Sequence, residues 1–75
     1  MKRQVTVKVT NKPGARVGLD IHQFAAPGVT TSYADGEGYA RFELDTDQHA
    51  EITIYVDGSE KFKRGPIQAY YETSV

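Results

Sequence analysis

Residues 30–45 read TTSYADGEGYARFELD, and this stretch decides the fold. Residues 39–44 alternate strictly between two faces, and a period of two is typical of a half-buried strand. The side chains expected to face inward are Ala40, Phe42 and Leu44. Residues 35–38 (DGEG) favour a turn, because glycine adopts positive φ angles easily and Asp35 can hydrogen-bond the turn backbone. Since residues 29–33 are β-branched and aromatic, we predict a hairpin of two strands joined by this turn.

The same alternation recurs along the rest of the chain, and no segment shows a helical period. The further strands predicted from it are residues 4–10, 16–24, 50–56 and 67–73, with one more strand between Gly58 and Gly65. Turns or connections are expected at residues 11–14, 25–28 and 45–49. Gly18 lies inside a predicted strand, which indicates a bulge or the close approach of another backbone. Pro66, at the start of the last predicted strand, suits the edge of a sheet.

Asp57 and Gly58 strongly indicate a hairpin between residues 50–56 and the strand that follows Gly58. Two registers of these strands are possible. In a two-residue loop, Phe62 lies opposite Thr53 on the outer face of the sheet. In a three-residue loop, Phe62 lies opposite Ile54 in the core, and the lysines on either side of it stay outside. We favour the three-residue loop, because lysines are rarely buried.

The composition describes one small domain, residues 1–75. A quarter of the residues are charged and the net charge is −1, which fits neither a disordered tail nor a protein that binds nucleic acid by overall charge. The chain has no cysteine, so disulfides and thiolate metal sites are excluded. No run approaches the ~20 apolar residues of a membrane span, and no apolar segment follows the basic residues 2–3 as in a signal peptide. We therefore expect a cytoplasmic protein with no membrane contact.

The order of these pieces resembles that of transthyretin-like and carboxypeptidase-regulatory-like domains, and of related bacterial immunoglobulin-like modules. The matching segments are residues 5–9, 17–21, 30–31, 35–42 and 52–56. The resemblance implies a small all-β, antiparallel β-sandwich of about six or seven strands, immunoglobulin-like or prealbumin-like. Such domains share a fold and not an activity, so the resemblance brings no catalytic residue.

The first candidate site is aromatic. If the connection at residues 45–49 closes a simple hairpin, Tyr39 faces Tyr55 on the outer face of the sheet, and Arg41 faces Thr53. Two tyrosines beside an arginine could stack on a sugar, a base or a peptide, because each ring has a flat apolar face and a polar tip. The simpler interpretation is a cross-strand pair that only stabilises the sheet.

The second candidate site is basic: Lys61, Phe62, Lys63 and Arg64 follow one another. Positive charges interleaved with an aromatic ring can bind single-stranded nucleic acid. The simpler interpretation is an edge strand that its lysines protect from aggregation, and the net charge of −1 favours it.

No motif predicts a metal, a cofactor or a catalytic set. The acidic turn residues do not have the spacing of a calcium-binding loop, and neither His22 nor His49 has a third ligand nearby in the sequence. No serine lies in a nucleophile motif. We therefore expect a protein that is not an enzyme: a structural or protein-interaction module that binds a protein partner or itself. A carbohydrate-binding module using the surface tyrosines is the alternative, and a single-stranded nucleic-acid binder is the weaker one.

Overall fold

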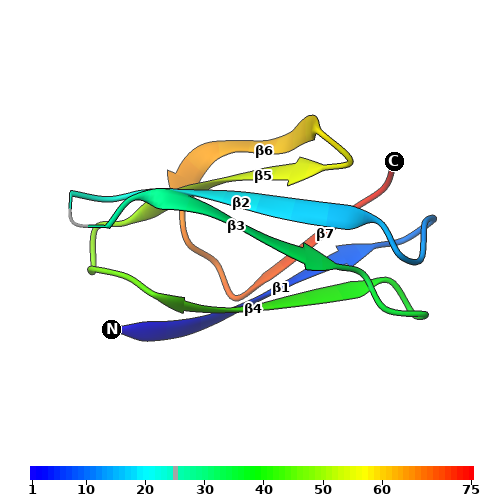
Figure 1. Cartoon of the computed structure of the whole chain (residues 1–75), viewed down its shortest axis with the longest axis horizontal. Helices are drawn as coiled ribbons and strands as arrows, with labels where there is room; N and C mark the ends of the chain where they lie inside the picture. The colour runs from blue at the N-terminus through cyan, green and yellow to red at the C-terminus, as the bar shows by residue number, and fades with distance from the viewer. Residues whose placement is uncertain (25) are drawn as a thin grey trace.

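The computed structural model describes residues 1–24 and 26–75, which form two β-sheets and no helix (Figure 1). Its strands are β1 (Lys2–Val9), β2 (Arg16–His22), β3 (Gly28–Tyr33), β4 (Tyr39–Asp45), β5 (Glu51–Val56), β6 (Ser59–Pro66) and β7 (Tyr70–Thr73). One sheet has the order β4-β1-β7, and the other has the order β3-β2-β5-β6. The prediction of an all-β fold built from two sheets is confirmed. Within the described part of the chain, no helix is long and apolar enough to cross a membrane.

The prediction that every strand pair is antiparallel is wrong for one pair. β1 lies between β4 and β7 in its sheet, and it runs antiparallel to β4 but parallel to β7. The first and last strands therefore lie side by side in the same direction, although more than fifty residues of chain separate them. Alternation along a single strand carries no information about the direction of its neighbour.

The predicted central hairpin is also wrong, because its two strands belong to different sheets. β3 pairs with β2, whereas β4 pairs with β1. The residues between them carry the chain from one sheet to the other. This crossing is anchored at Ala34, which is buried and exchanges backbone hydrogen bonds with the β1–β2 turn: its N–H donates to the carbonyl of Ala15 over 2.9 Å, and its carbonyl accepts from Gly14 over 3.0 Å.

The core lies between the two sheets, and the period of two locates it correctly. The inward side chains of β1, β4 and β5 are buried as expected; they are Val5, Val7, Val9, Ala40, Phe42, Leu44, Ile52, Ile54 and Val56. Val17 and Leu19 of β2 join them from the second sheet, while Ile21 is only partly buried. From β7, Tyr71 closes the core, with its ring in an edge-to-face contact with Phe62 at a centroid distance of 5.0 Å.

The β5–β6 hairpin combines features of both predicted registers. Its loop has two residues, Asp57 and Gly58, and both have positive φ angles, as a type I′ turn requires. The expected three-residue loop is therefore wrong. Phe62 nevertheless lies opposite Ile54 and packs against the core, because a register shift next to Tyr55 inserts one extra residue into β6. The bulge therefore brings Phe62 to the core, as the three-residue loop was expected to do.

Other expectations need smaller corrections. Gly18 causes neither a bulge nor a close approach: the pairing of β2 is regular across it, and an added Cβ would meet no atom within 4 Å. β2 ends at His22, earlier than predicted, where the Gln23 side chain donates to the carbonyl of Ala26. Ala25, the first residue of the predicted break at residues 25–28, lies outside the described residues. Pro66 ends β6, and the last strand begins only at Tyr70.

Candidate binding surface on the β4-β1-β7 sheet

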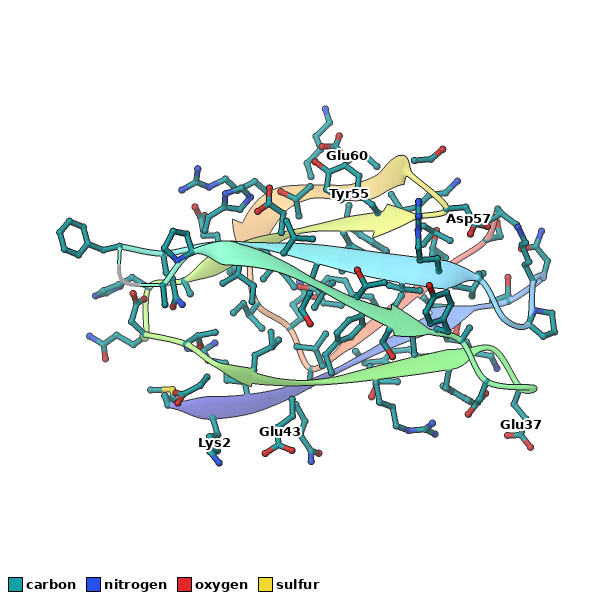
Figure 2. All side chains as sticks on the ribbon, viewed as in Figure 1. Lys2, Glu37, Glu43, Tyr55, Asp57 and Glu60 are labelled. Atoms are coloured by element: carbon teal, nitrogen blue, oxygen red, sulfur yellow. The ribbon has the colours of Figure 1, made fainter. Side chains whose placement is uncertain are left out.

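The structure separates the two tyrosines that were expected to pair. The chain crosses between the sheets after β4, so Tyr39 lies on one sheet and Tyr55 on the other, where its neighbours are Gly18 and Glu60. Figure 2 shows the consequence: Tyr55 and Glu60 extend from the sheet at the top of the view, and Glu43 extends in the opposite direction from the other sheet. The expected Tyr39–Tyr55 pair is therefore wrong.

Tyr39 instead has two cations over its ring. The Nζ atom of Lys8 lies 5.0 Å from the ring centroid, and the Cζ atom of Arg41 lies 5.1 Å from it. Lys8 is the direct partner of Tyr39 in the β1–β4 pairing, and Arg41 follows two residues later on the same face of β4. Both contacts are within the range of a cation–π interaction. Arg41 thus lies beside Tyr39 on the outward face on which the alternation of β4 places both residues, whereas sequence reasoning did not single out Lys8.

The turn before β4 holds this group in place. Asp35 accepts hydrogen bonds from the backbone N–H groups of Glu37 (2.9 Å) and Tyr39 (3.0 Å), and its other carboxylate oxygen binds Arg41 at 3.0 Å. The hydrogen bond from the Tyr39 N–H, followed by that from Arg41, holds the pKa of Asp35 below its ordinary value. The expected role of Asp35 as a turn former is confirmed, and it also orients the guanidinium beside the ring.

β7 adds an exposed tyrosine, Tyr70, to the same face as the half-buried Tyr39. In the parallel pairing Thr6 lies opposite Tyr70 and Lys8 lies opposite Glu72, so β1 separates Tyr70 from Arg41. The Tyr70 hydroxyl donates to Glu72 over 2.8 Å, and this hydrogen bond raises the pKa of Tyr70 to about 12. Nearly half of the Tyr70 side chain (46%) is exposed, which leaves the ring available to a partner.

We call this surface the Tyr39 face; its residues are Thr6, Lys8, Tyr39, Arg41, Tyr70 and Glu72. An open depression of about 340 Å³ lies between β1 and β4, and two residues of the face, Thr6 and Arg41, help to line it. The carboxylates of Asp35 and Glu72 are already bound to Arg41 and Tyr70, respectively. Within residues 1–24 and 26–75, no carboxylate lies within ion-pair distance of Lys8. The face therefore offers two tyrosines and an ammonium group without a partner carboxylate.

The predicted basic site is not a continuous surface. Phe62 points into the core against Ile54 and Tyr71, away from the solvent that a nucleic-acid base would occupy. Arg64 is paired with Glu51, with 2.9 Å between Nε and Oε1. Lys61 and Lys63 lie on the edge strand β6, an arrangement typical of lysines that protect an edge.

A larger surface depression, with an open volume of about 610 Å³, lies where β2 ends, and its lining includes Ile21, Gln23 and Pro27. Both histidines line it, and the Nε2 atom of His22 lies 2.9 Å from the hydroxyl of Thr53. The carboxylate of Asp20 is 3.8 Å from the same nitrogen. Among the described residues, no three histidine, cysteine or acidic side chains come together as a metal site. The depression thus has polar walls but no set of groups that can be assigned to a reaction.

Comparison of the chain with protein-family models, curated proteins and solved structures found no match. The functional argument therefore rests on the geometry of the chain itself.

Proposed function

We propose that the protein is a non-catalytic interaction module that binds a protein partner through the Tyr39 face. The observation that carries this proposal is the packing of Lys8 and Arg41 over the ring of Tyr39, with Tyr70 exposed two strands away. Tyrosine and arginine are the residue types that dominate binding energy in protein interfaces, since they combine a large apolar contact with directed hydrogen bonds.

The charges of the face indicate what the partner should supply. Arg41 is neutralised by Asp35. Lys8 lies over the ring of Tyr39 and opposite Glu72, but the Glu72 carboxylate accepts a hydrogen bond from Tyr70 and forms no ion pair with Lys8. A carboxylate of the partner placed near Lys8 would complete an ion pair at the rim of an aromatic contact, where charge pairs set orientation and association rate. We therefore expect a partner surface with an acidic residue next to an apolar one.

The carbohydrate alternative loses its main support. It was based on Tyr39 and Tyr55 sharing one outer face, and these two tyrosines lie on different sheets. The tyrosine that does share the face of Tyr39 is Tyr70, whose hydroxyl is bonded to Glu72. Lys8 and Arg41 also lie over the Tyr39 ring that a sugar would use for stacking. The nucleic-acid alternative is weakened in the same way by the inward position of Phe62.

We also propose that the sandwich belongs to the transthyretin-like class. Two sheets of three and four strands, ordered β4-β1-β7 and β3-β2-β5-β6, fit a small sandwich of this kind. The hydroxyl of Tyr71 donates to the carbonyl of Pro66 (3.1 Å) and accepts from the N–H of Gln68 (2.9 Å). A tyrosine that bonds back to the backbone just upstream is a recurrent corner in sandwich domains, which supports the assignment.

Site-specific photo-crosslinking in the cells that produce the protein tests the proposed function. A photoreactive amino acid replaces Thr6, at the centre of the Tyr39 face, or Glu60, on the outer face of the other sheet. We expect a discrete cross-linked product with a second protein from position 6 only, and we expect Arg41→Ala to abolish it. A product of equal yield from position 60, or one that survives Arg41→Ala unchanged, would contradict the assignment of the face.

A further inference from the structure

The two sheets have four edge strands, and three of them are protected against pairing with another chain. The edges are β4 and β7 in one sheet and β3 and β6 in the other. β7 has only four residues, and β6 is interrupted by two register shifts. β4 and β6 also carry charged side chains; these include Arg41, Glu43, Asp45, Lys61, Lys63 and Arg64. Short length, bulges and charges are the usual means by which proteins prevent edge-to-edge association.

β3 has none of these protective features. Its six residues, GVTTSY, contain no charge, no proline and no register shift relative to β2. Its outward side chains are freely exposed: Val29 has 72% of its surface accessible and Tyr33 has 65%. In the described part of the chain β3 pairs only with β2, so the backbone on its other side has no strand to bond with. An uncharged, β-prone edge of this kind is a template for an added strand.

We propose that β3 is a self-association edge, through which two copies of this chain pair antiparallel about a two-fold axis at Thr31. In this register Thr31 faces Thr31 of the second copy, Thr30 faces Ser32, and Val29 faces Tyr33. The sequence is self-complementary in this arrangement, because it forms two valine–tyrosine pairs on the outer face and hydroxyl pairs on the inner face. Such pairing is isologous, as the commonest homodimer symmetry requires, and it joins two four-stranded sheets into one continuous sheet.

The neighbouring strand is compatible with a second copy as the partner. On β2, Asp20 lies beside Val29 and Arg16 lies beside Tyr33. When Val29 of one copy faces Tyr33 of the other, four residues lie in line across the joined sheet. Asp20 of the first copy is at one end of this line, and Arg16 of the second copy is at the other. No like charges face each other across the axis, whereas a charged partner strand would find no counter-charge on β3 itself. A single six-residue edge is a small contact, so we expect a weak, concentration-dependent dimer.

Sedimentation equilibrium of the purified chain over a wide concentration range tests this inference. We expect the wild-type chain to pass from monomer to dimer as concentration rises. T31K and T31E each place two like charges at the two-fold axis, and both should remain monomeric under the same conditions. An equimolar mixture of T31K and T31E should regain dimer, because the lysine of one copy then faces the glutamate of the other. T10K is the matched control, since Thr10 is exposed just beyond β1 and away from β3.

Each outcome decides the proposal. Restored association in the T31K and T31E mixture, with T10K behaving as the wild type, supports pairing of β3 about Thr31. A wild-type chain that stays monomeric up to millimolar concentration would overturn the inference, and it would leave the edge to a strand from another protein. Dimers that persist equally in T31K and T31E would also overturn it, because they must use another surface. Circular dichroism of each variant establishes that the loss of dimer is not a loss of fold.

Discussion

The clearest stability prediction concerns Gly38, the last residue of the turn that leads into β4. Its φ angle is +92°, and a Cβ added there would lie 2.4 Å from the carbonyl oxygen of Val9. A left-handed backbone costs an L-residue roughly 1–2 kcal/mol. The contact cannot be relieved by rotating a side chain, because the clashing atom belongs to the backbone of the central strand. Moving it strains the hydrogen bond from the Val9 N–H to the Gly38 carbonyl (2.8 Å), which contributes a further ~0.5–1.5 kcal/mol.

Gly38→Ala should therefore lower the free energy of unfolding by about 2–4 kcal/mol once some residual clash is included. Urea denaturation followed by circular dichroism measures this as a lower midpoint at an unchanged slope. Gly36→Ala is the matched control: it lies in the same turn, lacks a positive φ angle, and its Cβ would meet no atom within 4 Å. The control should change stability by less than ~0.5 kcal/mol. Equal midpoints for the two variants would refute the claim that the close approach to β1 requires glycine at this position.

Further predictions concern the tyrosines and Asp35. Tyr71→Phe removes a hydroxyl that bonds the backbone of Pro66 and Gln68, so urea denaturation should show a loss of ~1–3 kcal/mol. Ultraviolet titration should find one tyrosine ionising near pH 12, and Glu72→Gln should return it toward 10, because the accepting carboxylate is gone. The pKa of Asp35 is lower in the folded chain than its ordinary value of 3.8, so its contribution to stability is present above that pH and is lost as pH falls through the folded pKa. Acid denaturation of Asp35→Asn should therefore depend less on pH below about pH 4 than that of the wild type.

The alternation of side chains predicts the strands well because it depends only on which face of each strand is buried. Val5, Val7 and Val9 must lie on one side of an extended chain wherever its neighbours are, and all three are in the core. On β7 the same alternation puts Tyr71 and Tyr70 on opposite faces, and the structure has Tyr71 buried and Tyr70 exposed. These assignments need no knowledge of which strands pair, and the structure confirms them.

Strand partners could not be obtained in the same way. A turn between two alternating strands can close a hairpin or carry the chain to the opposite sheet, and both solutions bury the same residues. The chain crosses between sheets after β3, where Ala34 is buried and bonds to the β1–β2 turn. The hydrogen bonds of Ala34 join residues about twenty positions apart, so no local sequence pattern predicts them. The chain crosses again after β4, where a hairpin was assumed, and this second crossing is the reason that the expected Tyr39–Tyr55 pair is incorrect.

The Tyr39 face could not be predicted because the pairing of β1 with β7 was not predicted. The sequence places Tyr39 and Arg41 on the outward face of one strand, but Tyr70 comes onto the same surface only because β1 lies between β4 and β7. Lys8 joins them by its position on that central strand. A parallel contact between the first and last strands has no short-range sequence signal, since its loop is nearly the whole chain.

The two proposed surfaces are independent in space, and this gives them a joint consequence. The Tyr39 face is the outer surface of the β4-β1-β7 sheet, whereas β3 extends the edge of the other sheet, as Figure 1 shows. Pairing through β3 therefore leaves two copies of the Tyr39 face exposed on one dimer. A partner that presents repeated sites would bind such a dimer more tightly than a monomer, although each contact is unchanged. T31K should then weaken binding to a multivalent partner but not binding to a partner with a single site. Arg41→Ala should weaken both kinds of binding and leave the monomer–dimer equilibrium unchanged.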